Sequence, residues 1–209
     1  MRNFAVLIPV KSSNVKSRLA SVLSLSERRE LESLLLGGVI RALKEAGLLA
    51  NTHVVTSDPE ILRLAASLGV RPLEEAGDRG VNAAVATGIR ALGSPYRVMV
   101  LPSDLPLLRP SEARHLVRLS GLADVVIAPS ASFNGTNALV FSPKAGLTLS
   151  YDRDSFWNHI KTSGRRGLTV CVSSKPGLTF DLDSPEDLST LARSGTKSQA
   201  VAFARRATG

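Results

Sequence analysis

The sequence has few of the features that mark several large classes of protein. Only one of its 209 residues, Cys171, is a cysteine, so no disulfide can form within the chain and we expect a reducing compartment. A membrane-spanning helix needs about 20 predominantly apolar residues, and no apolar run is long enough. The apolar segment at residues 4–10 is also too short for a signal peptide. The sequence therefore predicts a cytoplasmic protein that does not enter a membrane.

Aromatic side chains are scarce, at 4% of the sequence, whereas the formal net charge is +8. A basic balance favours polyanionic partners, and nucleic acid is the first that it suggests. The basic residues are scattered, however, and neither a base-stacking motif nor a zinc motif is present. The composition therefore favours a small polyanion as the ligand, and we expect no nucleic-acid partner. The alternative is a non-catalytic protein that binds nucleic acid.

The glycine-rich phosphate-binding motifs are missing. The chain contains neither the P-loop pattern GxxxxGK[ST] nor the dinucleotide fingerprint GxGxxG. A dinucleotide-dependent oxidoreductase would need a glycine-rich turn after its first strand, and the sequence there reads "PVKSSNVK". If the protein binds a nucleotide, other groups must therefore neutralise the phosphates.

Strand-like and helix-like segments alternate along the chain, which at this length suits one globular domain. Continuous apolar runs predict buried strands, and apolar residues at helical spacing predict helices. The expected strands cover residues 4–10, 52–57, 70–73, 96–101, 124–129, 137–142 and 168–173, and the expected helices cover 25–46, 58–69, 80–92, 109–120, 154–163 and a segment from 184. The pattern predicts an α/β fold: a single-domain, mostly parallel, doubly wound sheet with helices on both faces.

Two helix starts carry capping signals. Ser24 and Glu27 have the spacing of a capping box, and Ser184 is followed by Pro-Glu-Asp. We assign residues 1–194 to the domain, and residues 195–209 form a basic tail or a weak terminal helix. In sheets of this kind ligands lie beyond the carboxyl ends of the strands, so the residues that follow strands matter most.

A basic loop follows the first strand. Lys11, Lys16 and Arg18 lie within eight residues, and both side-chain types suit phosphate oxygens. The loop is positioned to hold a triphosphate, although a solvated loop of no function would look the same.

Acidic residues follow two later strand-like runs. Asp104 lies between two prolines in "LPSDLPLL", where it can bind a hard divalent cation or simply cap the next helix. Asp181 and Asp183 are two residues apart, so an extended chain places them on the same side. Like charges this close repel one another unless a cation lies between them. We favour a Mg²⁺ site, the alternative being that Asp183 only begins the helix at Ser184.

Polar residues near other strand ends are weaker candidates. Gly135 frees the backbone between Asn134 and Thr136, before an expected strand, and Asn137 adds an amide. This segment suits an anionic ligand or an ordinary tight turn. Asn82 begins a helix, where its amide could read a base or ribose or cap the helix.

The histidines carry no clear catalytic signal. Ser155 and His159 occur together in "YDRDSFWNH", but a histidine beside Phe156 and Trp157 is more typical of packing, so we assign it no role. No Ser/His/Asp or Cys/His arrangement is evident, and Cys171 is expected in the core.

The motifs taken together resemble those of a known family. "IPVK", "KSRL", "VVTSD", "VNAAV", "LPSDLPLL", "NGTNAL", "SF…H" and "DLDSPEDL" occur in that order across almost the whole chain. This set is similar to the 2-phospho-L-lactate guanylyltransferases of coenzyme F420 biosynthesis. The resemblance implies a sheet of the nucleotide-diphospho-sugar transferase (GT-A-like) type, related to the molybdopterin guanylyltransferases.

The resemblance also implies roles for the candidate residues. The loop cations fall on Lys11, Lys16 and Arg18, the Mg²⁺ ligands on Asp104, Asp181 and Asp183, and the contacts to the acceptor acid on Thr136 and the region of Ser155. The implied substrates are GTP and a small phosphorylated carboxylic acid, joined with release of pyrophosphate; the oligomeric state, including a homodimer, stays open. Many relatives have glycines where this chain has residues 152–154, so the acceptor pocket can differ. Phosphoenolpyruvate, 3-phosphoglycerate and a molybdopterin-type acceptor stay as alternatives.

Overall fold

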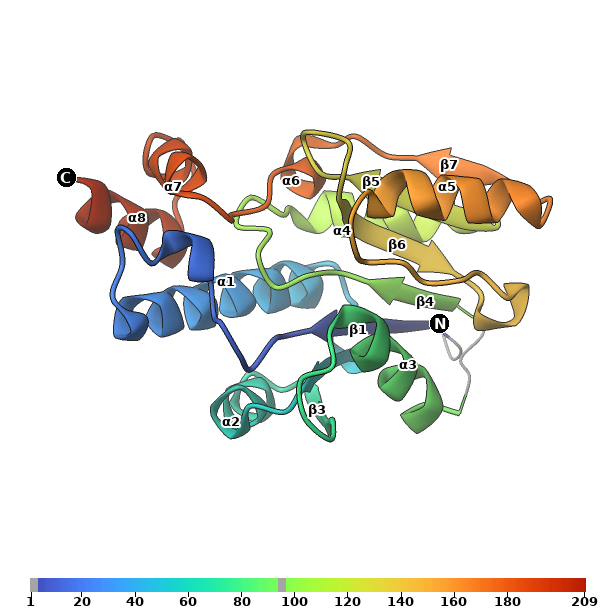
Figure 1. The fold of residues 1–209 in the computed structure, drawn as a ribbon, viewed down its shortest axis with the longest axis horizontal. Helices are drawn as coiled ribbons and strands as arrows, with labels where there is room; N and C mark the ends of the chain where they lie inside the picture. The colour runs from blue at the N-terminus through green and yellow to red at the C-terminus, as the bar shows by residue number, and fades with distance from the viewer. Residues whose placement is uncertain (1–3, 94–96) are drawn as a thin grey trace.

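A seven-stranded sheet forms the centre of the protein (Figure 1). The structure, a computed structural model, describes residues 4–93 and 97–209. Its strands are β1 (Phe4–Pro9), β2 (Thr52–Thr56), β3 (Arg71–Glu74), β4 (Arg97–Val100), β5 (Val125–Pro129), β6 (Thr136–Phe141) and β7 (Val170–Val172). They lie in the order β3-β2-β1-β4-β6-β5-β7, and β6 alone runs antiparallel to its neighbours. The predicted fold, α/β with a mostly parallel sheet, is confirmed; residue 96, where one predicted strand began, lies outside the described residues.

Helices cover both faces of the sheet because most of its strands are buried on both sides. The helices are α1 (Leu25–Glu45), α2 (Pro59–Ser67), α3 (Val81–Ala91), α4 (Pro110–Leu119), α5 (Ser155–Arg165), α6 (Pro176–Thr179), α7 (Pro185–Ala192) and α8 (Gln199–Thr208). One core cluster packs α1, α2, α4 and α6 against the sheet, and a second packs α3 and α5 on the opposite face. Cys171, which was expected in the core, is half-buried and packs against the first cluster.

Local sequence signals set the helix ends correctly. Both predicted starts are capping boxes, formed by Ser24 with Glu27 and by Ser184 with Asp187. The strand-like run before Asp183 is not a strand: Pro176–Thr179 is helical, and residues 180–183 belong to neither a helix nor a strand. That segment finds its hydrogen-bond partner in a loop instead, because the amide of Leu182 donates to the carbonyl oxygen of Asp104 at 3.0 Å.

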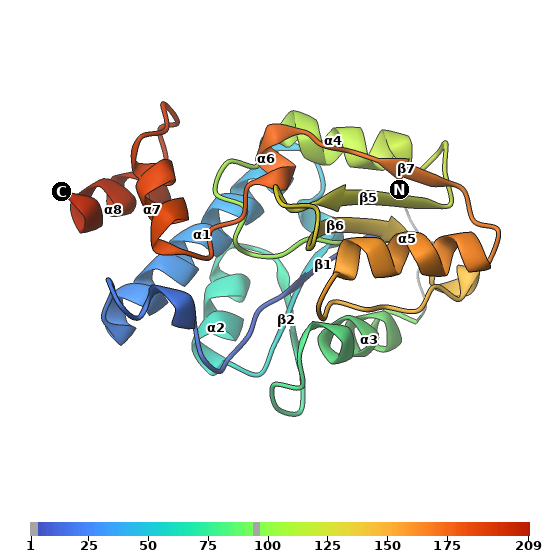
Figure 2. The same cartoon turned by 45° about the horizontal axis from the view of Figure 1, so that its top comes forward.

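The C-terminal segment packs against the domain. Helices α7 and α8 lie together beside the start of α1, away from the strands, in both views (Figures 1 and 2). Leu19, Leu31, Leu191 and Phe203 share a third core cluster there. Of the two sequence-based alternatives for the C-terminus, the structure has the helix.

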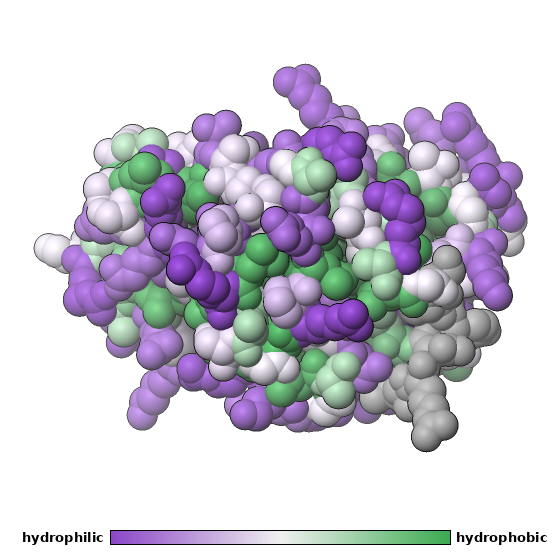
Figure 3. Space-filling model, turned by 90° about the horizontal axis from the view of Figure 1, so that it is seen from below, coloured by the Kyte–Doolittle hydropathy of each residue, from purple (hydrophilic) through white to green (hydrophobic). Residues whose placement is uncertain are grey.

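The surface mixes hydrophilic and hydrophobic side chains, as the face in Figure 3 shows. The exposed large apolar side chains are scattered over several elements: Val22, Leu25, Leu122, Phe133, Trp157 and Val172. Within the described residues, no helix combines the length and apolar composition needed to cross a membrane.

Candidate active site

The predicted site residues come from segments that reach one edge of the sheet. The basic loop follows β1, Asp104 follows β4, and Asp181 and Asp183 precede α7. Thr136 begins β6, whose antiparallel direction brings its first residue to the carboxyl ends of β4 and β5. Four segments far apart in the sequence therefore meet at the edge where this type of sheet binds ligands.

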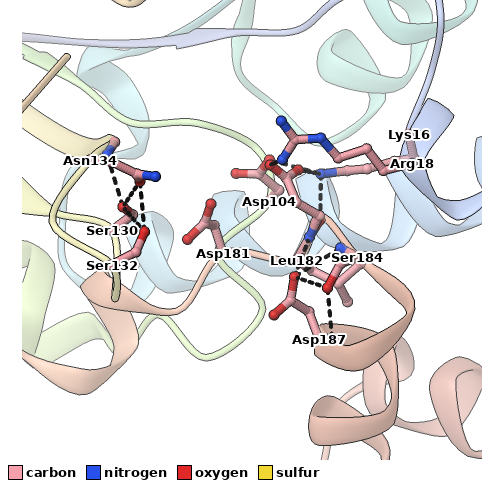
Figure 4. Close-up of polar contacts among 12 residues, drawn as sticks. Lys16, Arg18, Asp104, Ser130, Ser132, Asn134, Asp181, Leu182, Ser184 and Asp187 are labelled. Carbon is pink, nitrogen blue, oxygen red and sulfur yellow. Dashed lines mark hydrogen bonds and ion pairs between the residues drawn. The ribbon is translucent and has the colours of Figure 1, made fainter. Parts of the chain in front are cut away.

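Lys16 contacts two carboxylates of an acid cluster, which we define as Lys16, Asp104, Asp181 and Asp183. Figure 4 labels Lys16, Asp104 and Asp181. The Nζ atom of Lys16 donates to Asp104 Oδ2 at 2.7 Å, to the carbonyl oxygen of Leu182 at 2.7 Å and to Asp183 Oδ1 at 3.4 Å. The side chain of Lys16 is only 6% exposed, so these oxygens replace the water that would otherwise solvate the ammonium group.

The positive charge of Lys16 is balanced by Glu32 as well as by the two carboxylates that Lys16 contacts. Burial alone would lower the pKa of this ammonium group, but Asp104, Glu32 and Asp183 together raise it above its ordinary value. Glu32 is buried on α1 and accepts a hydrogen bond from Ser103 Oγ at 2.6 Å. Lys16 therefore stays protonated in a pocket of negative charge.

Asp181 completes the acid cluster from its other side. Asn137 Nδ2 donates to Asp181 Oδ1 at 3.0 Å. Burial raises the pKa of the Asp181 carboxyl group, and the charges of Asp104 and Asp183 raise it further, against the Asn137 hydrogen bond. The pKa of Asp181 is therefore sensitive to the other two carboxylates of the acid cluster. Within residues 4–93 and 97–209, however, no three acidic, histidine or cysteine side chains already form a metal-binding set.

The loop after β1 is held in the conformation that turns Lys16 inward. Asn14 and Lys16 both have positive φ, at 51° and 45°, which costs energy for residues other than glycine. Ser13 offsets this cost by donating its amide and hydroxyl to Asp78 Oδ2, at 3.1 and 2.7 Å. Arg28 donates to the carbonyl oxygen of Val15 at 2.7 Å. The basic loop is therefore anchored to the rest of the protein, which its composition alone did not indicate.

The three loop cations lie in different environments. Arg18 is largely exposed and its nearest carboxylate is Asp183, with Nη1 3.4 Å from Oδ2. Lys11 lines a pocket with Arg29 and Glu60, next to a cavity of about 270 Å³ between the segments that follow β1 and β2. Only Lys16 is enclosed among the aspartates.

A β-bulge sets which side of the sheet the first two residues of β6 face. Ala128 pairs with Ala138, but Pro129 pairs with Thr136, so Asn137 is the extra residue on its strand. The extra residue resets the alternation of side chains between the two faces of the sheet. Thr136 consequently faces α5, whereas Asn137 reaches Asp181.

Thr136 belongs to a hydroxyl cluster, which we define as Thr136, Ser155 and His159. Ser155 Oγ donates to Thr136 Oγ1 at 3.1 Å, and His159 Nδ1 lies 3.1 Å from the same oxygen. The ring of Tyr151 meets that of His159 edge-on, with centroids 5.1 Å apart. Sequence analysis assigned no role to His159, yet its spacing of four from Ser155 on an expected helix places both on one face.

Asn82 does not cap its helix. The N-cap residue is Gly80, and Asn82 instead accepts a hydrogen bond from the amide of Tyr151 at 3.0 Å through Oδ1. Its Nδ2 atom lies 3.4 Å from Asp152 Oδ2. Asn82 therefore joins α3 to the segment before α5, next to the hydroxyl cluster.

Comparison with known proteins agrees with the family that the motifs resemble. Residues 4–208 match the family described as "Guanylyl transferase CofC like". The chain belongs to this family. It is 40% identical over 199 residues to phosphoenolpyruvate guanylyltransferase of Rubrobacter xylanophilus, covering 93% of this chain and 96% of that protein.

Relatives of the family differ in the acceptor for which they are named. The 2-phospho-L-lactate guanylyltransferase of Methanothermobacter thermautotrophicus is 34% identical, with 99% of this chain and 91% of that protein covered. The 3-phospho-D-glycerate guanylyltransferase of Phenylobacterium zucineum is also 34% identical, with coverage of 90% and 89%. All three relatives are guanylyltransferases, so the chain is a nucleotidyltransferase as predicted.

Solved structures show the same fold at low sequence identity. A nucleotide-diphospho-sugar transferase structure from Desulfovibrio desulfuricans G20 superposes with a TM-score of 0.78 at 18% identity, covering 99% of this chain and 95% of that chain. A Mycobacterium tuberculosis protein in complex with manganese gives a TM-score of 0.63 at 14% identity, with coverage of 92% and 98%. The predicted type of sheet is therefore confirmed.

Proposed function

We propose that this protein transfers GMP from GTP to the phosphate group of 2-phospho-L-lactate, with release of pyrophosphate, as in coenzyme F420 biosynthesis. The family membership supports the guanylyl donor. The observation that carries the proposal is the acid cluster at the carboxyl edge of the sheet, opposite the hydroxyl cluster. A phosphate oxygen of the acceptor attacks the α-phosphorus of GTP, and the bond to the pyrophosphate oxygen breaks.

The acid cluster suits a divalent cation, which we propose to be Mg²⁺. Asp104 Oδ2, Asp183 Oδ1 and the carbonyl oxygen of Leu182 already converge on one cationic atom, Nζ of Lys16. Hard oxygen donors of this kind are the ligands that Mg²⁺ and Mn²⁺ take in proteins. We assign Asp104, Asp181 and Asp183 to this role. A bound cation would neutralise phosphate oxygens and stabilise the charge that develops on the α-phosphoryl group.

The chain's own residues then have three tasks. Lys16 and Arg18 balance the charge of the aspartates and of the approaching triphosphate, and Lys11 faces the phosphates from the neighbouring cavity. Thr136, with Ser155 hydrogen-bonded behind it, forms the binding site for the acceptor acid, and Asn137 holds Asp181 in the acid cluster. Because phosphate is already a competent nucleophile, no covalent enzyme intermediate is needed.

Phosphoenolpyruvate is a second candidate for the acceptor. The relative that is 40% identical over nearly its whole length is named for this acid. Both acids carry a phosphate beside a carboxylate, so the same hydroxyl cluster can serve either. The family resemblance implies glycines where this chain has residues 152–154. These residues belong to the segment that Asn82 contacts, where we expect discrimination between such acids to occur.

The proposal is tested by measuring pyrophosphate release for GTP, ATP, CTP and UTP against 2-phospho-L-lactate, phosphoenolpyruvate and 3-phosphoglycerate. We expect activity with GTP and with one of the first two acids, in the presence of Mg²⁺ or Mn²⁺ and not with a chelator. Activity that is equal with all four nucleotides would refute the guanylyl assignment. Activity that survives the chelator would refute the metal site.

A further inference from the structure

The hydroxyl cluster becomes more enclosed from Thr136 to His159. Thr136 is 8% exposed, Ser155 is 3% exposed and His159 is fully buried. Thr136 is therefore the member that a ligand would meet first, and the other two lie behind it. This order raises the question of what a buried histidine contributes to a threonine at the edge of the site.

The hydrogen bonds of His159 fix the position of its ring proton. The backbone amide of Ser150 donates to His159 Nε2 at 3.1 Å, and an amide can only donate. Nε2 must therefore carry a lone pair, so the proton of the neutral ring lies on Nδ1. Nδ1 then donates to Thr136 Oγ1 across the 3.1 Å contact.

Two donors therefore point at the hydroxyl oxygen of Thr136. His159 Nδ1 is the first and Ser155 Oγ, at 3.1 Å, is the second. A hydroxyl oxygen has two acceptor positions, and both are filled. Its own proton must then point to an acceptor, and no hydrogen bond among the described residues takes that proton. Thr136 is thus left as a donor only.

The surroundings keep His159 neutral and in place. Burial lowers the pKa of the imidazole to about 4, and the neighbouring groups are the neutral Tyr151, Ser150, Thr136 and Ser155. A protonated ring would lose its bond from the Ser150 amide, so the arrangement depends on the neutral form.

We infer that His159 is a positioning residue that makes Thr136 an obligatory hydrogen-bond donor to an anionic oxygen, phosphate or carboxylate, of the acceptor acid. The inference rests on the proposed function, which places the acceptor at Thr136. It explains why the cluster combines three uncharged groups: together they offer a directed donor to an anion without burying a positive charge.

A matched pair of substitutions tests the inference. The amide nitrogen of asparagine occupies the position of imidazole Nδ1, so His159→Asn keeps the donor to Thr136. Glutamine reaches the position of Nε2, so His159→Gln keeps the contact to Ser150 and loses that donor. We expect His159→Gln to raise KM for the acceptor acid about five- to tenfold, the effect of one lost hydrogen bond, with KM for GTP unchanged. His159→Asn should stay within about twofold of wild type.

Ser163→Ala is the control. Ser163 donates to the backbone carbonyl of His159 at 2.8 Å on the same helix and makes no contact with Thr136. It should leave both KM values unchanged. Thermal unfolding of each variant shows that the chain is folded. Equal KM values in the Asn and Gln variants, or parallel changes for both substrates, would overturn the inference.

Thr136→Val separates this inference from the proposed acceptor site. If the site is correct, Thr136→Val raises KM for the acceptor whatever the role of His159. If Thr136→Val raises it and His159→Gln does not, the positioning role is wrong and the site stands. If neither changes it, the acceptor lies elsewhere and the proposed site itself fails.

Discussion

The acid cluster and the hydroxyl cluster have opposite chemistry, although two neighbouring residues, Asn137 and Thr136, reach one cluster each. Asn137 reaches the acid cluster, where Lys16 and three carboxylates hold formal charge close together. Thr136 reaches the hydroxyl cluster, where every group is neutral and nearly all are buried. Neighbouring residues of a strand face opposite sides of the sheet, and the bulge in β6 sets which side each of these two residues faces. The difference supports our proposal that the two sides of one strand end bind the two substrates in different ways, the polyanion through charge and the acid through directed protons.

The two clusters should respond to different perturbations. Charge in the acid cluster is partly exposed to solvent, so its contributions depend on the balance of charges and on bound cations. The hydroxyl cluster depends on geometry and on which atoms carry protons. Substitutions in the two clusters should therefore differ in the size and kind of their effects.

Removing one carboxylate of the acid cluster should have the largest effect. For Asp104→Asn we expect the rate of pyrophosphate release to fall on the order of 10²- to 10³-fold, because the charge that stabilises the transition state is no longer held in place. The same substitution at Asp124, which lies before β5 at the opposite edge of the sheet, is the control. Near-normal activity of Asp104→Asn would show that the charge of the acid cluster does not contribute to the reaction as proposed.

In the hydroxyl cluster, His159 should make the free energy of unfolding depend on pH. The folded pKa of His159, about 4, is below its unfolded value of 6.5. A depressed pKa means that the unfolded chain binds the proton more tightly, so stability is fully present above pH 6.5 and is lost as the pH falls toward 4. The loss should reach about 3 kcal/mol at pH 4. The free energy of unfolding, measured with urea at pH 7 and near pH 4, should differ less between the two pH values for His159→Asn than for wild type. An equal difference in the two proteins would contradict the prediction.

Lys16→Met should make the acid cluster dependent on added cations. Without the ammonium group, Asp104 and Asp183 lose their shared partner, and we expect a destabilisation of about 2 kcal/mol, less than for a fully buried pair because the carboxylates are partly exposed. Mg²⁺ should then raise the melting temperature of the variant more than that of wild type. An identical response of both proteins would show that the cation does not bind at these oxygens.

The smallest effect on stability should come from Arg18→Gln. The pair between Arg18 and Asp183 is 3.4 Å long, and the arginine side chain is 76% exposed. Exposed pairs contribute under about 1 kcal/mol, so the melting temperature should barely change. KM for GTP should still rise if Arg18 faces the triphosphate. If Arg18→Gln lost as much stability as Lys16→Met, the exposed Arg18 would contribute as much to stability as the buried Lys16, against this prediction.

Much of the fold followed from local signals. Apolar runs, helix caps and alternation of elements were enough to predict the parallel sheet and the starts of α1 and α7. The run before Asp183 was misassigned because apolar spacing alone does not show whether a segment has a strand to pair with. The antiparallel direction of β6 could not be seen either, since direction depends on how the connecting segments cross the sheet.

The candidate site was predicted in part. Strand ends pointed to Asp104 and the basic loop, the spacing of two residues pointed to Asp181 and Asp183, and the family resemblance pointed to Ser155. Glu32 was missed although it interrupts the apolar stripe of α1, a position where a carboxylate needs a partner. That Lys16 is buried among carboxylates while Lys11 is not could not be read from their similar sequence context.

The sequence by itself determined the sheet type, the family and the kinds of side chain available at the ligand edge, because these depend on short-range patterns and on residue identity. Only the tertiary structure decided that Lys16 turns inward, that a bulge turns Thr136 toward α5 and Asn137 toward Asp181, and that a buried histidine directs a threonine hydroxyl group. The reason is physical: proton positions and charge balance depend on distances of about 3 Å between residues that lie up to 167 positions apart in the chain.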